Sequence, residues 1–121
     1  MIKNFLLVAF GAGLGGSMRY AISLLFKQQS FPFGTLVINI AGSFILGCLV
    51  ALHLKNNNIS EGYLLFAGTG ICGGFTTFSA FSYENVSLLQ AGKYDLVFCY
   101  ILASVVAGIT TAWLGFKLIN P

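Results

Sequence analysis

The sequence predicts an all-α membrane protein in which four transmembrane helices form one integral membrane domain. Of its 121 residues, 57% are hydrophobic and only 7% are charged, whereas about a quarter of a soluble domain is charged. Uncharged stretches at 28–54, 62–83 and 96–116 each supply the roughly 20 residues that a helix needs to cross a bilayer. So few charges cannot cover a water-facing surface, which excludes a soluble monomeric enzyme. The high hydrophobicity also excludes a disordered chain.

Short turns separate the expected helices, whose bounds are about 4–26, 33–53, 62–89 and 95–117. Turn-forming residues mark the connections at Pro32, at 56–58 and at 91–93. A signal peptide is the competing interpretation of the first segment. It fits poorly, because the apolar character continues through Phe26 and no mature soluble part follows.

Composition and spacing argue against several other classes of protein. The cysteines Cys48, Cys72 and Cys99 are odd in number and lie in apolar stretches, so we interpret them as core residues. The net charge of +3 is too weak and scattered for a nucleic-acid binder. No nucleophile–base pair, carboxylate pair or metal-ligand spacing supports an enzyme.

The positive charges give almost no preferred orientation in the membrane. With four spans, one side carries Lys3, Lys55 and Lys117, and the other carries Lys27 and Lys93 with Arg19 close by. Orientation follows the Lys and Arg bias between the two sides. A protein without a difference in charge between its two sides can insert in either orientation, and two copies can then pair head to foot as an antiparallel dimer. The alternative is a weak charge bias that the insertion machinery corrects. Four helices enclose little space alone, which also favours an oligomer.

Small and polar residues recur on two of the expected helices. The first contains Gly11 and Gly15 in a GxxxG spacing, and the second has a polar or small residue every fourth position from Thr35 through Asn39 and Ser43. Such patterns allow helices to approach closely in lipid. Asn39 has two interpretations, because a carboxamide in the hydrocarbon zone either bonds to a neighbouring helix or lines a polar path.

The third expected helix contains an unfavourable sequence near its middle. The glycines Gly73 and Gly74 are followed by the β-branched Thr76 and Thr77, which favours a break at the bilayer centre. Irregular backbone at that depth lines a cavity or is buried in protein, and it often forms an ion site. In a head-to-foot dimer, the carbonyl groups of Gly73 and Thr76 from both copies would surround one small cation.

Phe78 and Phe81, three residues apart, project from the same side of this helix, with Ser79 between them. Two phenylalanines in a membrane helix usually serve helix packing. Aromatic rings nevertheless have a positive edge. Ring edges, the Asn39 amide and the hydroxyl of Ser43 or Ser79 would replace the water around a small hard anion.

Arg19, Glu84 and His53 each lie near an expected helix end, so the default interpretation is a side chain that reaches the membrane interface. Arg19 has a second interpretation, in which it attracts anions into a vestibule.

Three motifs in order resemble the CrcB/Fluc family of fluoride channels over nearly the whole chain. They are GGSMRY at 15–20, FGTLVIN at 33–39 followed by Gly42 and Ser43, and GGFTTFSAF at 73–81. The resemblance implies a dual-topology homodimer with two antiparallel pores in the bacterial cell membrane, through which fluoride leaves the cell passively. It also implies a structural, non-transported Na⁺ at the break.

The resemblance assigns roles to individual residues. Backbone carbonyls of Gly73 and Thr76 hold the Na⁺, and the family's first-helix arginine corresponds to Arg19. The pore asparagine is Asn39 and the pore phenylalanines are Phe78 and Phe81. Because the chain keeps these three residues, we expect a self-sufficient homodimer and not half of a pair of unlike subunits.

One residue departs from the family, which usually has threonine where this chain has Ala80. The polar lining that the resemblance implies for the pore therefore lacks one hydroxyl group.

Two other functions are alternatives to a channel. A small four-helix proton-coupled drug antiporter needs a titratable group within the membrane, and the first helix has no acidic residue. A non-conducting membrane subunit leaves the central break without a purpose.

Overall fold

A computed structural model describes residues 1–27, 29–55 and 59–120, and the regular structure of these residues is helical. Four helical stretches are long and apolar enough to cross a membrane: Ile2–Leu25, Phe33–Lys55, Glu61–Gln90 and Tyr94–Ile119. They confirm the four expected spans to within a few residues at each end. The expected turn at Asn56, Asn57 and Asn58 lies outside the described residues.

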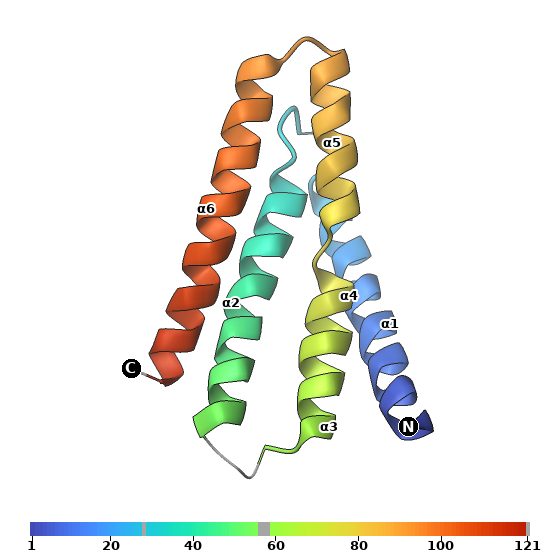
Figure 1. Cartoon of the computed structure of the whole chain (residues 1–121). Helices are drawn as coiled ribbons and strands as arrows, with labels where there is room; N and C mark the ends of the chain where they lie inside the picture. Colours follow the sequence, from blue (N-terminus) through green and yellow to red (C-terminus); the bar gives the residue numbers. More distant parts are fainter. Residues whose placement is uncertain (28, 56–58, 121) are drawn as a thin grey trace.

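The third span is assembled from several pieces. It begins with α3 (Glu61–Leu64), continues as the π-helix η1 (Leu65–Cys72) and a last turn α4 (Gly73–Phe75), and resumes as α5 (Phe78–Gln90) (Figure 1). Thr76 and Thr77 between α4 and α5 are extended, with φ, ψ of −76°, 160° and −155°, 124°. Thr77 caps α5, since its hydroxyl accepts the Ala80 N–H at 3.2 Å.

Gly73 and Gly74 are helical, although the sequence analysis counted them as part of the unfavourable segment. The irregular backbone lies instead at the two threonines, whose β-branched side chains favour extended conformations. The π-helix before the glycines was not expected. Gly73, which directly follows the π-helix, is exposed on one face of the span.

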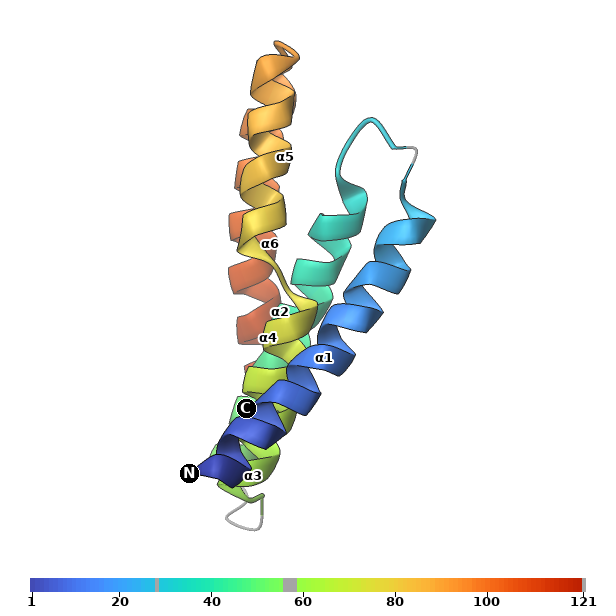
Figure 2. The ribbon, with the colours of Figure 1, turned by 90° about the vertical axis from the view of Figure 1, so that its right-hand side faces the viewer.

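The spans pack in two groups. α1 (Ile2–Leu25) lies along η1 and α4, while α2 (Phe33–Lys55) lies along α6 (Tyr94–Ile119), which also contacts α5. Figure 2 shows α5 and α6 rising together while the ends of α1 and α2 lean away from them. The irregular Thr76–Thr77 backbone therefore lies where the third span leaves α1 and continues beside α6.

Glycines bring α1 and the third span into backbone contact. A methyl group added at Gly11 would lie 2.9 Å from Gly70 Cα, and one added at Gly15 would lie 2.7 Å from Phe75 N. Gly47 of α2 meets the Ala112 backbone of α6 in the same way. The GxxxG pattern of the first helix thus serves close helix packing, as small residues do in lipid.

A cluster of buried side chains lies around α5 and α6. Tyr100 is completely buried and packs with Leu88 and Val97, and Phe31 and Phe81 lie against this cluster. Large apolar side chains such as Phe98 and Ile109 are instead exposed on the outside. An apolar exterior around a small, partly polar interior is what a lipid environment requires.

Candidate functional site

Asn39 of α2 forms two hydrogen bonds with the irregular backbone of the third span. Its Nδ2 donates to Thr77 O at 3.1 Å, and its Oδ1 accepts the Thr77 N–H at 2.8 Å. One side chain therefore satisfies both backbone groups that Thr77 would otherwise leave unpaired in the membrane. The inter-helix interpretation of Asn39 is confirmed.

Asn39 also faces a cavity of about 490 Å³ between α2 and the third span. Among the residues that line this cavity are five that the sequence analysis selected: Asn39, Ser43, Gly73, Thr76 and Phe78. The structure thus brings together residues from two distant parts of the sequence. Both interpretations of Asn39 remain compatible, because a carboxamide nitrogen has two hydrogens and Thr77 O takes one of them.

The interruption frees the carbonyl groups of Gly73 and Thr76. In a continuous helix, Gly73 O would accept the Thr77 N–H, but that N–H donates to Asn39. Thr76 O would accept the Ala80 N–H, but that N–H donates to the Thr77 hydroxyl. Carbonyl oxygens without a helical donor are suitable ligands for a hard cation, so these two residues fit a Na⁺ site.

The two phenylalanines differ in their surroundings. Their ring centroids are 5.6 Å apart, so they lie side by side as expected. Phe78 is 78% exposed and lines the cavity of Asn39, whereas Phe81 is half-buried. The Phe81 ring contacts Tyr100 in an edge-on arrangement with centroids 5.0 Å apart. The two rings therefore form a row of contacts in which Phe78 lines the cavity of Asn39 and Phe81 contacts Tyr100.

Beyond Phe81, a carboxylate holds two hydroxyl groups from different helices. Thr35 donates to Glu84 Oε1 at 2.6 Å, and Tyr100 donates to Glu84 Oε2 at 2.7 Å. The sequence favoured a Glu84 side chain that reaches the membrane interface, and the depth of Glu84 in the membrane stays a prediction; the structure shows its carboxylate bonded to hydroxyl groups of α2 and α6. The available signal was spacing, because Glu84 is three residues after Phe81 and Thr35 is four residues before Asn39.

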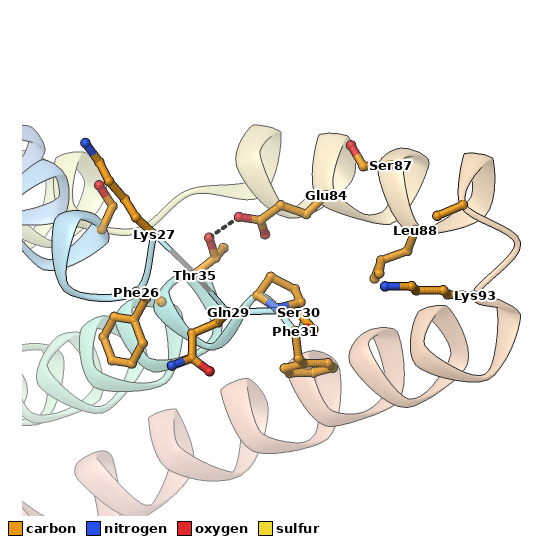
Figure 3. Close-up of a pocket in the computed structure, with 14 residues that line it drawn as sticks. Phe26, Lys27, Gln29, Ser30, Phe31, Thr35, Glu84, Ser87, Leu88 and Lys93 are labelled. Carbon is orange, nitrogen blue, oxygen red and sulfur yellow. Dashed lines mark hydrogen bonds between the residues drawn. The ribbon is translucent and has the colours of Figure 1, made fainter.

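A second cavity of about 420 Å³ lies beside Thr35 and Glu84 (Figure 3). Thr35 and Glu84 line it together with Ser87 and the two lysines Lys27 and Lys93. In Figure 3 the Lys93 ammonium group points back along α5 into the cavity, whereas that of Lys27 points away. Glu84 therefore lines this cavity while its carboxylate accepts from Tyr100, whose ring contacts Phe81.

Besides Phe81, two predicted site residues, Ser79 and Arg19, line neither cavity. Ser79 is exposed, and its hydroxyl is 3.2 Å from the Thr77 hydroxyl. Arg19 is half-buried on α1, near Gly16. Neither is among the residues that line the two cavities. Their expected roles in the pore and the vestibule stay predictions.

These features define a multi-pass α-helical membrane protein with polar cavities between its spans. The model of the family described as CrcB-like protein, Camphor Resistance (CrcB), matches residues 6–116, and the chain belongs to this family. The resemblance drawn from the three sequence motifs is thereby confirmed.

Curated relatives match over nearly the whole chain. The fluoride-specific ion channel FluC of Azobacteroides pseudotrichonymphae is 46% identical, with 98% of this chain and 97% of the relative covered. That of Pyrococcus abyssi is 47% identical, with 97% and 96% covered. Fluoride-specific ion channel FluC 1 of Listeria monocytogenes serotype 4b is 45% identical, with 98% of each chain covered.

Proposed function

We propose that this protein is a fluoride-selective passive channel that exports fluoride from the cytoplasm across the cell membrane and so reduces its toxicity. The observation that carries the proposal is the 46% identity, over 98% of the chain, to a protein named as a fluoride-specific ion channel. The cavity lined by Asn39, Ser43 and Phe78 supports it, since all three side chains are neutral.

A neutral polar lining suits a small hard anion that must bind and leave again. The second Nδ2 hydrogen of Asn39, the Ser43 hydroxyl and the edges of Phe78 and Phe81 would replace water around fluoride without holding it as an ammonium group would. Ser79 adds a hydroxyl next to Phe78, and Arg19 attracts anions toward the pathway.

We propose that the working unit is an antiparallel homodimer in which the third span of each copy is interrupted at mid-membrane. Phe78 is 78% exposed and Gly73 is also exposed, although both lie in the middle of a membrane span beside a polar cavity. A second copy covers this face, and the near absence of charge bias allows it to insert in the opposite orientation.

A structural Na⁺ at the dimer centre completes this proposal. The carbonyl oxygens of Gly73 and Thr76 from each copy would hold it, since both lack their helical donors. The cation supplies fixed positive charge between the two interrupted spans and is not transported. Its loss should weaken the dimer.

The function is tested by fluoride release from liposomes. Purified protein is reconstituted in vesicles loaded with fluoride, and a potassium ionophore is added to remove the charge imbalance. We expect rapid release of fluoride and retention of chloride in parallel vesicles. Equal release of both anions, or release of neither, contradicts the proposal.

The same vesicles separate a channel from a proton-coupled drug antiporter, the alternative that an inward-facing Glu84 makes worth testing. A channel moves fluoride down its electrochemical gradient until the gradient is gone. An antiporter instead accumulates a cationic drug when only a pH gradient is imposed. Drug uptake under that condition, without fluoride release, would favour the antiporter.

A further inference from the structure

We propose that Phe31 is a third phenylalanine of the anion pathway, and that its ring edge binds fluoride where the ion leaves the 420 Å³ cavity. This inference rests on the proposed channel function, in which Phe78 and Phe81 already contribute ring edges. It extends that function to a residue in the connection between α1 and α2, which the sequence analysis did not select.

Four aromatic rings form a continuous row of contacts. The ring centroids of Phe31 and Tyr100 are 5.2 Å apart with their planes at 74°, and those of Tyr100 and Phe81 are 5.0 Å apart at 61°. Phe78 continues the row, with its centroid 5.6 Å from that of Phe81. These separations and tilts are the ones that aromatic pairs prefer. Phe31 lines the 420 Å³ cavity and Phe78 lines the 490 Å³ cavity, so each end of the row faces a cavity.

Phe31 is held in place by packing, although it lies outside the helices. Its carbonyl oxygen accepts the Phe33 N–H at 2.8 Å, and the centroid of the Phe33 ring is 4.7 Å from its own. Pro32 follows directly and favours extended backbone at Phe31. The side chain points toward α6 in Figure 3 and packs against the buried cluster that contains Tyr100. Phe31 is therefore an anchored ring at the wall of the cavity.

At this end of the row, Phe31 is the ring that faces the cavity. Tyr100 is 0% exposed and lines neither of the two cavities, whereas Phe31 is half-buried and lines the 420 Å³ cavity. An anion that moves from this cavity along the row therefore meets Phe31 before the rings behind it.

The charges in the 420 Å³ cavity suit an anion that then passes to a ring edge. Lys27 and Lys93 line this cavity, and positive charge in a cleft raises the local concentration of anions. A ring edge carries only a small positive charge, so it attracts an anion more weakly than an ammonium group does. Phe31 thus provides a step between the lysines and the neutral lining that Asn39 and Ser43 give the other cavity.

The competing explanation is that Phe31 only anchors the connection between α1 and α2 to α6. Removing its ring would then lower the stability of the fold, and with it the amount of active protein. The fluoride concentration that gives half-maximal flux would not change. A ring edge that binds fluoride predicts a change in that concentration, because the ion has lost one of its partners.

The first test compares wild type, Phe31→Leu and Phe31→Tyr in fluoride-loaded liposomes across a series of fluoride concentrations. Leucine is apolar but has no ring, so we expect its half-saturating fluoride concentration to rise about three- to tenfold, the size of a partly desolvated interaction between an ion and a ring. Tyrosine keeps the ring and should stay near wild type. Thermal unfolding of each variant reports the packing separately.

The second test changes the charge of the ring edge and keeps the ring. Pentafluorophenylalanine in place of Phe31 has a similar shape, but its fluorine atoms make the edge negative. We expect the half-saturating fluoride concentration to rise at least as much as in Phe31→Leu. If Phe31→Leu does not fold, pentafluorophenylalanine and Phe31→Tyr make the comparison, because both retain an aromatic ring.

Two matched controls remove a neighbouring ring. Phe33→Leu removes the ring that contacts Phe31 but lines neither cavity, at a position that is 45% exposed. Phe26→Leu removes a ring that lines the 420 Å³ cavity but does not belong to the row. Both should keep the half-saturating fluoride concentration of wild type.

The outcomes distinguish this inference from the proposed function. A wild-type protein that releases no fluoride contradicts the channel function itself. A conducting wild type whose half-saturating fluoride concentration is unchanged by pentafluorophenylalanine at position 31 overturns the role of Phe31 alone. An equal rise in Phe26→Leu or Phe33→Leu also overturns it, because the effect would then not belong to the row.

Discussion

The Asn39 side chain forms two hydrogen bonds with the backbone of Thr77, one to its carbonyl oxygen and one from its N–H. These bonds replace the helical hydrogen bonds that the extended Thr77 lacks inside a membrane span. The pair has two consequences. It makes the interruption of the third span tolerable in lipid, and it diverts the N–H that Gly73 O would otherwise accept. Asn39 thus links helix packing to the carbonyl groups that we propose as Na⁺ ligands.

Replacing Asn39 should therefore destabilise the fold. In Asn39→Ala both backbone groups of Thr77 lose their partner, at a cost of about 1–3 kcal/mol for each. Asn39→Asp retains an acceptor for the Thr77 N–H but has no donor for Thr77 O, so its loss should be smaller. The free energy of unfolding in mixed micelles measures both. Ser43→Ala, in the same cavity wall, is the control, and equal stability of Asn39→Ala and this control would contradict the prediction.

The glycine contacts of α1 predict a position-specific effect of one methyl group. Gly15→Ala places the methyl group against Ile71 O and 2.7 Å from Phe75 N, so α1 and the third span must separate. Overpacking of this kind costs about 1–3 kcal/mol or more. Gly13→Ala is the matched control on the same helix, because nothing lies within 4 Å of the added methyl. Thermal unfolding should distinguish the two, with Gly13→Ala at or slightly above wild type.

An aromatic ring at position 81 should be required for fluoride release. Phe81→Ile keeps an apolar side chain against Tyr100 but removes the ring edge, so we expect flux to fall at least about tenfold while the dimer stays intact. Phe98→Ile, at a position 69% exposed on the outside, should behave as wild type. Full activity of Phe81→Ile in the liposome assay would remove the ring from the mechanism.

Gly73 offers a test of the proposed dimer that does not disturb the single chain. A methyl group added there meets only Gly68 O, at 3.9 Å, which is an ordinary contact. Gly73→Ala should keep the helical content of the protein but weaken pairing, since the face that we propose for the second copy and the Na⁺ is altered. Size-exclusion chromatography in detergent, with and without Na⁺, measures this. An unchanged dimer, equally stable without Na⁺, would count against the central site.

Lys93 should influence the rate through long-range attraction. Lys93→Gln removes a positive charge from the 420 Å³ cavity that Glu84 lines, so fluoride release should slow by about two- to tenfold at 0.01 M salt. At 0.15 M salt, where the Debye length falls from about 30 to about 8 Å, the difference should shrink. Lys117→Gln is the control at the other end of α6. A deficit that is the same at both salt concentrations would indicate a local structural effect.

Much of the candidate site was predictable from the sequence because polar residues in a membrane span are expensive. Asn39, Ser43, Gly73, Thr76 and Phe78 stand out against an apolar background, and the structure gathers them at one cavity. The partners of Glu84 were not predictable, because its position along the chain indicates only that it lies near a helix end. Whether a carboxylate there turns outward or inward depends on the rotation of α5 relative to α2 and α6.

The sequence by itself determined the four spans, their approximate ends and the positions of the polar residues, because hydrophobicity and charge act locally along the chain. The tertiary structure alone decided which polar groups meet: Asn39 with Thr77, and Glu84 with Thr35 and Tyr100. A hydrogen bond between helices requires matched depth, tilt and rotation of both. Depth, tilt and rotation are set by contacts between helices, such as those of Gly11 and Gly15 of α1 with the backbone of the third span. Such contacts join distant segments, so no single segment of the sequence specifies them.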